Sequence, residues 1–242
     1  MTKYEEIEAK RNRFHKSTVS RFYTALIIAG EPSIQAFEQG SQSFSISQDP
    51  IIKAYVQTYQ IVGVYFAQSS LREVDRLFKD AAQDLRPQWL IQMEQYVLSE
   101  AGNRIKSVTD YTLELVRKTI NEAVNEGLGS RETARNIRNK WKEISRTRSE
   151  AIARTEIVTA SNRGSLVGAQ AAGIDLVKNW LATPGPRTRE SHLIAGRDER
   201  NKRVPLDDPF IVGGEELDYP GDPKGSAKET IQCRCTLVYE PV

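Results

Sequence analysis

The chain has 242 residues, with 34 lysines and arginines against 32 aspartates and glutamates, so its formal net charge is +2. Hydrophobic residues make up 39% of the chain and charged residues 27%, which excludes a wholly disordered chain and allows a buried core. A net charge this close to zero also argues against a protein that coats nucleic acid through bulk electrostatics.

The sequence predicts neither a membrane span nor a secretory signal. Its longest apolar runs, such as residues 25–29, are far shorter than the roughly 20 residues that a span needs. Residues 1–13 are charged and lack the apolar stretch of a signal peptide. The two cysteines, Cys233 and Cys235, are separated only by Arg234, so a disulfide between them would be strained. We therefore expect a reducing compartment.

The first two-thirds of the chain has helical patterning. Residues 4–29 are charged and helix-permissive, and they predict a first helix. Gly30 and Pro32 then predict a break over residues 30–48. Asp49, followed directly by a proline, is typical of a helix start and predicts the next helix.

A further helical segment is expected to begin at Pro87. Its apolar residues recur at three- and four-residue steps as far as Val124. This stripe predicts one helix of about 35 residues or two helices divided at Gly102.

Two more helices are predicted before the pattern changes. Ser130 is positioned to cap a short helix, and Thr147 with Glu150 fits a capping box for another helix that ends near Gly173. We therefore divide the chain into a helical arm or bundle over residues 1–129, connecting helices over 130–174, and a C-terminal module over 175–242.

The C-terminal module differs in composition, because seven of the ten prolines lie between Pro184 and Pro241. The expected fold class is α+β, with an extended, all-helical N-terminal region followed by a small, loop-rich α+β module. Its predicted elements are a strand over 176–182, a short helix over 188–194, strands over 204–206 and 210–212, and a terminal strand around 233–240.

The residues with possible chemistry cluster in the same module. They are Trp180, Arg187, Arg189, His192, Asp207, Phe210, Gly214, Pro220, Gly221, Asp222, Pro223, Gln232, Cys233, Arg234 and Cys235. Three interpretations compete for them: a metal site, a catalytic site and a structural network.

In the first interpretation His192, Cys233 and Cys235 bind zinc, and Asp207 or Asp222 completes a set of four ligands. The pattern is weak, because the module offers no further cysteine or histidine.

In the second interpretation His192 is a general base beside the phosphate-binding cations Arg187 and Arg189, as in a nuclease or a nucleotide-handling enzyme, or it pairs with one of the two cysteines as a thiol nucleophile. No third, orienting residue is fixed by the spacing in either form.

We favour the third interpretation. A module with little regular structure has many unpaired backbone groups, and arginine, histidine, aspartate and glutamine side chains can bond them. On this view the chain has no catalytic residue and no metal ligand, and the two cysteines pack beneath a strand.

These residues also resemble a known family. The run Ile152-Ala-Arg-Thr-Glu156 with Asn162 and Gly173 resembles the helix before the shared module of phage head-morphogenesis proteins. The motifs after it are similar to the minor head module of phage Mu protein F-like proteins, and the resemblance covers about residues 130–240. These motifs include Trp180, the run from Arg187 to His192, the run from Tyr219 to Pro223, and Gln232-Cys-Arg-Cys235. Members typically end in Asn-Cys-Arg-Cys, where this chain has Gln232 in the asparagine position. The expected structural motif is Arg154, Glu156, Trp180, Arg187, His192, Asp208, Phe210, Gly214, Pro220, Asp222, Cys233, Arg234 and Cys235.

The resemblance implies a minor capsid protein of a tailed bacteriophage, with no established enzymatic activity and no cofactor. It is expected to be made in the host cytoplasm and to lie inside the head near the portal, where it assists genome packaging or delivery. Its expected partners are the portal protein and the inner surface of the major capsid protein, and no membrane.

A basic stretch within residues 131–148 has two interpretations. Its ordinary one is a solvated helix face, and its functional one is non-specific contact with the phosphates of packaged DNA. The residues expected to make that contact are Arg131, Arg135, Arg138, Lys140 and Lys142.

Overall fold

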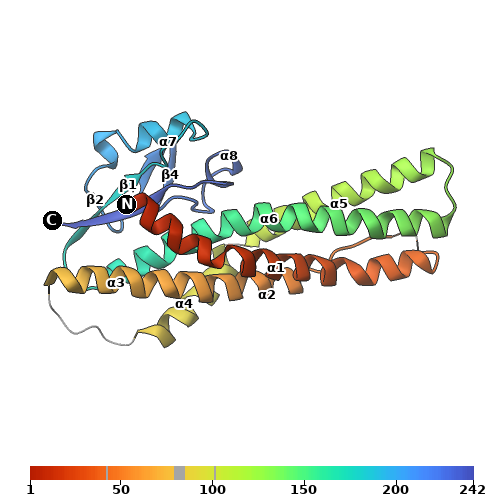
Figure 1. Ribbon diagram of the computed structural model, residues 1–242, viewed down its shortest axis with the longest axis horizontal. Coiled ribbons are helices and arrows are strands. Elements are labelled where there is room, and N and C mark those ends of the chain that lie inside the picture. Colours follow the sequence, from red (N-terminus) through yellow and green to blue (C-terminus); the bar gives the residue numbers. More distant parts are fainter. Residues whose placement is uncertain (42, 79–84, 101) are drawn as a thin grey trace.

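The computed structural model describes residues 1–41, 43–78, 85–100 and 102–242 (Figure 1). The helices of its N-terminal part are α1 (Lys3–Glu38), α2 (Asp49–Thr58), the π-helical turn η1 (Tyr59–Gly63), α3 (Val64–Phe78), α4 (Arg86–Glu100), α5 (Gly102–Asn125) and α6 (Ser130–Gln170). The long helices α1, α3 and α6 run side by side along the long axis of the molecule. The C-terminal module lies over the end of this bundle at which the chain also begins.

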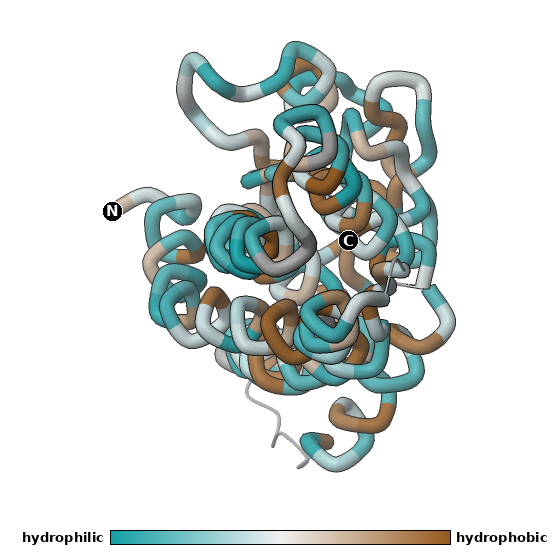
Figure 2. Tube along the Cα trace, turned by 90° about the vertical axis from the view of Figure 1, so that its right-hand side faces the viewer, coloured by the Kyte–Doolittle hydropathy of each residue, from teal (hydrophilic) through white to brown (hydrophobic). Residues whose placement is uncertain are grey.

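The end-on view shows the same arrangement, with the helices gathered below and the module above them (Figure 2). The core of the bundle consists of one apolar side of each helix, and it includes Phe22, Tyr55, Val62 and Ile137, each at most 1% exposed. Within one helix the buried residues recur at helical spacing, as Phe22, Leu26 and Ala29 do in α1.

The first helix is longer than the sequence predicts. It begins with a capping box, in which Thr2 accepts a hydrogen bond from the amide of Glu5 and the Glu5 carboxylate accepts one from the amide of Thr2. It then continues through Gly30 and Pro32 to Glu38, so the predicted break over residues 30–48 is wrong for its first nine positions.

Tertiary packing explains why the helix survives there. The indole of Trp141 in α6 lies directly on Gly30, and a Cβ atom at that position would be 2.3 Å from the ring. The glycine is therefore a contact residue and not a helix terminator. Ala29 and Ile34, both buried, hold the turns on either side of Pro32 against the core.

The sixth helix also differs from expectation, because it runs without interruption from Ser130 to Gln170. The predicted new start at Thr147 is wrong. Ile144 and Ile152 are both buried on the same apolar stripe, which passes across the capping signal. Burial of that stripe outweighs the preference of one threonine for a helix terminus.

Other predictions are confirmed. A helix begins beside Pro87, and the long apolar stripe after it is shared between α4 and α5, on either side of residue 101. Among the described residues, no helix has the length and hydropathy that crossing a membrane requires.

A close helix–helix contact fixes α6 against η1 and α3. A Cβ atom added to Gly164 would lie 2.0 Å from the carbonyl oxygen of Gly63, and one added to Gly168 would lie 2.2 Å from that of Ala67. The two backbones therefore touch along two successive turns, which only small residues permit. In the sequence, the four-residue spacing of Gly164 and Gly168 is the pattern that indicates such a close helix contact.

The C-terminal module confirms the α+β fold class. Strand β1 (Leu176–Leu181) is the centre of an antiparallel sheet in the order β2–β1–β5, between β2 (Val204–Pro205) and β5 (Thr236–Pro241). Strands β3 (Phe210–Val212) and β4 (Glu215–Leu217) form a hairpin, and the short helices are α7 (Glu190–Ala195), η2 (Glu199–Asn201) and α8 (Ala227–Thr230).

The terminal strand begins later than predicted, at Thr236. Cys233 and Cys235 consequently lie in the loop before β5, with Trp180 of β1 paired opposite Leu237. Residues two apart point to the same side of an extended segment, so both thiols can face one neighbour.

Replacing Gly164 by alanine tests the helix–helix contact. We expect a loss of about 1–3 kcal/mol in the free energy of unfolding, because the added methyl group meets a backbone carbonyl that cannot move aside. This loss exceeds the gain of up to about 1 kcal/mol that alanine brings over glycine in a helix. Chemical denaturation measures the difference.

The matched control is Gly102→Ala in α5, where an added Cβ atom meets nothing within 4 Å. It should not destabilise the protein. A Gly164→Ala protein as stable as the unmodified chain would contradict the close contact.

Candidate functional site

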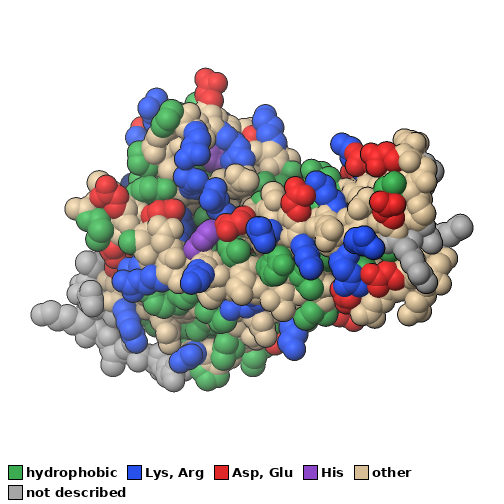
Figure 3. Space-filling view, turned by 45° about the vertical axis from the view of Figure 1, so that its right-hand side comes forward, with side chains coloured by type: hydrophobic (Ala, Val, Ile, Leu, Met, Phe, Trp, Pro, Cys, Tyr) green, Lys and Arg blue, Asp and Glu red, His purple; other side chains and the backbone are tan. Residues whose placement is uncertain are grey.

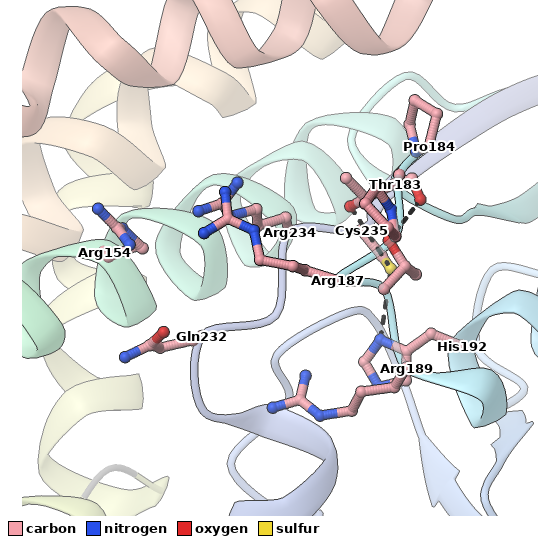
Figure 4. A pocket seen from close by; sticks show the side chains of 12 residues that line it. Arg154, Thr183, Pro184, Arg187, Arg189, His192, Gln232, Arg234 and Cys235 are labelled. Carbon is pink, nitrogen blue, oxygen red and sulfur yellow. Dashed lines mark hydrogen bonds between the residues drawn. The ribbon is translucent and has the colours of Figure 1, made fainter.

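Two thiols and one imidazole meet at the centre of the C-terminal module. His192 is presented by α7, and Cys233 and Cys235 come from the loop before β5. The imidazole Nδ1 atom lies 3.4 Å from the sulfur of Cys235 and 3.6 Å from that of Cys233. All three residues are at most 2% exposed. Figure 4 shows the ring of His192 directed at the Cys235 sulfur.

The orientation of the imidazole is fixed on its other sides. Its Nε2 atom lies 3.1 Å from a carboxylate oxygen of Glu229 in α8, and the hydroxyl of Ser191 donates to that same oxygen at 2.7 Å. The indole of Trp180 packs edge-on against the ring at a centroid distance of 5.5 Å, and it makes a second edge contact with Phe210. Both ring nitrogens of His192 therefore have partners within the protein.

The two thiols are coupled to each other. Hydrogen bonding between the sulfurs, together with contact to His192, lowers the pKa of Cys235. The same sulfur–sulfur bond, together with burial, raises the pKa of Cys233.

A basic cavity of about 310 Å³ opens beside this cluster. Its wall includes His192 and Cys235 but not Cys233. The remaining lining residues are Arg154, Thr183, Pro184, Gly185, Pro186, Arg187, Thr188, Arg189, Gln232 and Arg234, several of which Figure 4 labels. The space-filling view shows basic side chains gathered on the module, whereas acidic and basic side chains are mixed along the helices (Figure 3).

A buried ion pair lies where the module meets the bundle. Glu156 of α6 is 1% exposed and accepts hydrogen bonds from Tyr59 at 2.9 Å and from Arg104 of α5 at 3.2 Å. The second guanidinium nitrogen of Arg104 donates to the carbonyl of Gly221 at 3.0 Å. Burial, and then the Glu156 carboxylate, raise the pKa of Tyr59, so its phenol keeps the proton that it donates.

Two further helix side chains hold the loop that carries the cysteines. Arg11 of α1, 2% exposed, donates to the carbonyl of Arg234 at 3.2 Å and to the side-chain oxygen of Asn162 at 3.0 Å. Asn162 of α6 in turn donates to the carbonyls of Pro220 at 2.8 Å and Cys235 at 3.1 Å. Backbone groups that the short strands leave unpaired are thus bonded by the bundle.

The structure brings only part of the predicted motif together. Trp180, His192, Phe210, Cys233 and Cys235 form the central cluster, and the arginines at 154, 187 and 234 line the cavity. Glu156 and Pro220 lie at the junction with the bundle, whereas Gly214 forms the β3–β4 turn at a φ of 86° and Asp208 is exposed on a turn.

The two aspartates that the zinc interpretation requires as a fourth ligand lie elsewhere. Asp222 accepts hydrogen bonds from the amides of Asp218 at 2.8 Å and Lys224 at 3.1 Å, and burial raises its pKa. Asp207 accepts from the side chain of Gln170 at 2.7 Å. Neither aspartate belongs to the group formed by His192, Cys233 and Cys235.

Sequence reasoning missed three residues of this region: Arg11, Arg104 and Glu229. Each is an ordinary charged residue in a charged segment, and nothing in its local pattern marks it as buried. Ser191 was also missed, although it directly precedes His192 in the sequence.

The basic residues expected to contact DNA lie along α6. They are Arg131, Arg135, Arg138, Lys140 and Lys142. Arg138 pairs with the carboxylates of Glu31 and Glu38 in α1, and Lys140 pairs with the glutamate three residues ahead. The side chain of Arg131 lies outside the described part of the structure. The Arg138 pairs link α6 to α1, and both paired cations have less free charge for phosphate contact than the sequence suggests.

Comparison with known proteins identifies the protein family of this chain. Residues 114–238 match the family described as Phage Mu protein F like protein, which is just over half of the chain. The chain therefore belongs to this family, and the resemblance inferred from its motifs is confirmed. The family is one of phage head morphogenesis, which associates the chain with the capsid.

One curated relative has a different kind of name. The NAD(+)--arginine ADP-ribosyltransferase EFV of Enterococcus faecalis (strain ATCC 700802 / V583) is 32% identical over 145 residues. The matched part is 57% of this chain but only 28% of that protein, so the chain spans little more than a quarter of its length. No solved structure matches the chain.

Replacing Glu156 by glutamine tests the junction. We expect the free energy of unfolding to fall by about 3–5 kcal/mol, because the buried guanidinium of Arg104 loses its counter-charge. Thermal and chemical denaturation measure the change.

The control is Asp110→Asn, which also converts a carboxylate to an amide beside a cation of α5. The Lys106–Asp110 pair is exposed, so its loss should leave stability nearly unchanged. An equal loss in the free energy of unfolding for both substitutions would contradict the stabilising role of the buried Arg104–Glu156 pair.

Proposed function

We propose that this protein is a structural component of the phage head that lies inside the capsid at the portal vertex, and that it is not an enzyme. Its partners in this proposal are the portal protein and the inner surface of the major capsid protein. Family membership supports a role in head morphogenesis.

One observation carries the structural role. The buried polar side chains where the bundle meets the module, above all Glu156 and Asn162 of α6, are bonded to other side chains or to the backbone of the protein itself. Such bonding stabilises the module on the end of a helical bundle and leaves these groups unavailable to a substrate. The bundle then supplies the long surface for partner contact.

The nuclease alternative fits this geometry less well. A general base needs a ring nitrogen that faces the substrate. In His192, Nδ1 faces the two sulfurs and Nε2 faces Glu229, so both nitrogens already have partners within the protein. The activity named for the Enterococcus faecalis relative belongs to a protein more than three times as long as the matched region, and we do not extend it to this chain.

The outer face of α4 is the best candidate for the portal contact. Ile91 and Leu98 lie two turns apart on one side of this helix and are 57% and 60% exposed. Ile61 of η1, which packs against α4, is 46% exposed. Exposed aliphatic side chains on neighbouring helices suit an apolar partner surface.

Incorporation into heads tests this proposal. Heads assembled with portal should contain the protein, and heads assembled without portal should lack it. The double variant Ile91→Glu/Leu98→Glu should reduce incorporation about tenfold or more, because two charges would enter the apolar contact.

The control is Ile28→Glu on α1, at a side chain that is 54% exposed. It should be incorporated normally. Normal incorporation into portal-less heads would contradict the portal contact, and turnover of nucleic acid by the purified protein would contradict the non-enzymatic role.

A further inference from the structure

The central cluster has the composition and geometry of a metal-binding site. One imidazole nitrogen and two thiol sulfurs, all buried, have their ligand atoms within 4.8 Å of one another. We propose that His192, Cys233 and Cys235 bind one zinc ion, with a water molecule from the neighbouring cavity as the fourth ligand. This site is independent of which partner the helical bundle contacts.

The distances agree with tetrahedral zinc. Zinc–sulfur bonds of about 2.3 Å and zinc–nitrogen bonds of about 2.0–2.1 Å at tetrahedral angles place the nitrogen about 3.6 Å from each sulfur. The observed distances from Nδ1 are 3.4 Å to Cys235 and 3.6 Å to Cys233. Both nitrogen–sulfur distances thus match those that a zinc ion requires, and all three donor atoms lie within 4.8 Å of one another.

Hydrogen bonding alone accounts less well for this arrangement. An unprotonated imidazole nitrogen has one lone pair and accepts one hydrogen bond, yet two sulfurs lie within 3.6 Å of Nδ1. A metal ion at the point between the three atoms uses the lone pair and both sulfurs at once.

The surroundings of His192 support the same conclusion. The Glu229 carboxylate, 3.1 Å from Nε2, favours the tautomer in which Nε2 carries the proton and Nδ1 is free to bind a metal. A carboxylate behind a histidine ligand is a usual partner in zinc sites, because it orients the ring and strengthens its basicity. Ser191 and Trp180 hold the carboxylate and the ring in place.

The donor set selects the kind of ion. Two sulfurs and one nitrogen suit zinc, whereas magnesium and calcium require oxygen ligands. Two thiolates and a zinc ion together have no net charge, so the site needs no further counter-ion inside the module. Since His192 and Cys235 line the cavity, solvent reaches the fourth position from that side.

Metal analysis tests this proposal directly. The full chain, purified without chelator and then equilibrated with zinc, should contain one zinc ion per molecule. His192→Ala, Cys233→Ser and Cys235→Ser should each lose most of it. Glu229→Gln keeps all three ligands and should bind zinc about 10–100-fold more weakly.

The chain provides a matched control in its one other histidine, His15, which is half-exposed on α1 beside Glu150. His15→Ala should retain one zinc ion. Circular dichroism of every variant separates loss of the metal from loss of the fold. Replacement of zinc by cobalt(II) should give the charge-transfer absorption of thiolate ligands in the folded protein, and Cys233→Ser should weaken it.

Labelling with a thiol reagent gives a second measure that does not depend on any variant. Zinc should slow the modification of both cysteines in the unmodified chain, and a chelator should restore the faster rate. A folded protein that takes up no zinc, or whose zinc content and labelling rate are unaffected by these changes, would overturn the proposal.

Discussion

Buried carbonyl groups in the loops of the C-terminal module depend on side chains of the helical bundle. The module has only short strands, so its loops leave many backbone groups without a partner in the sheet. Arg11, Arg104 and Asn162 supply donors to the carbonyls of Pro220, Gly221, Arg234 and Cys235. Each buried carbonyl left without a donor would cost about 1–3 kcal/mol.

This constraint connects the bundle to the thiol cluster. Cys235 is held through its carbonyl by Asn162, and the residue before it is held by Arg11. The loop is thereby set at the distance at which its two sulfurs meet His192.

The sequence predicts the type and order of the helices and strands better than it predicts the contacts between them. The change in proline content marks the start of the module, and the helix start at Pro87 and the strand before Thr183 follow from local signals. Gly30 misleads because its role is to receive the indole of Trp141, a partner more than a hundred residues away. Local propensity cannot reveal such a contact.

The sequence indicates which residue types of the C-terminal module could form a site, but it does not give their arrangement in space. His192, Cys233 and Cys235 are conspicuous because histidine and cysteine are rare in this chain. Glu229, which orients the histidine, is one of many acidic residues, and only the fold shows that it is buried. The same holds for Arg11, whose position in a charged helix gives no hint that it bonds a loop over two hundred residues ahead.

Hydrogen exchange in the variant Asn162→Leu tests the central claim most directly. The account predicts that amides in the loops and strand over residues 218–238 exchange at least about tenfold faster, while α1 and α3 keep their protection. The exposed asparagine of α1 provides the control as Asn12→Leu, which should leave the whole pattern unchanged. Unaltered protection over residues 218–238 in Asn162→Leu would contradict the dependence of the module on the bundle.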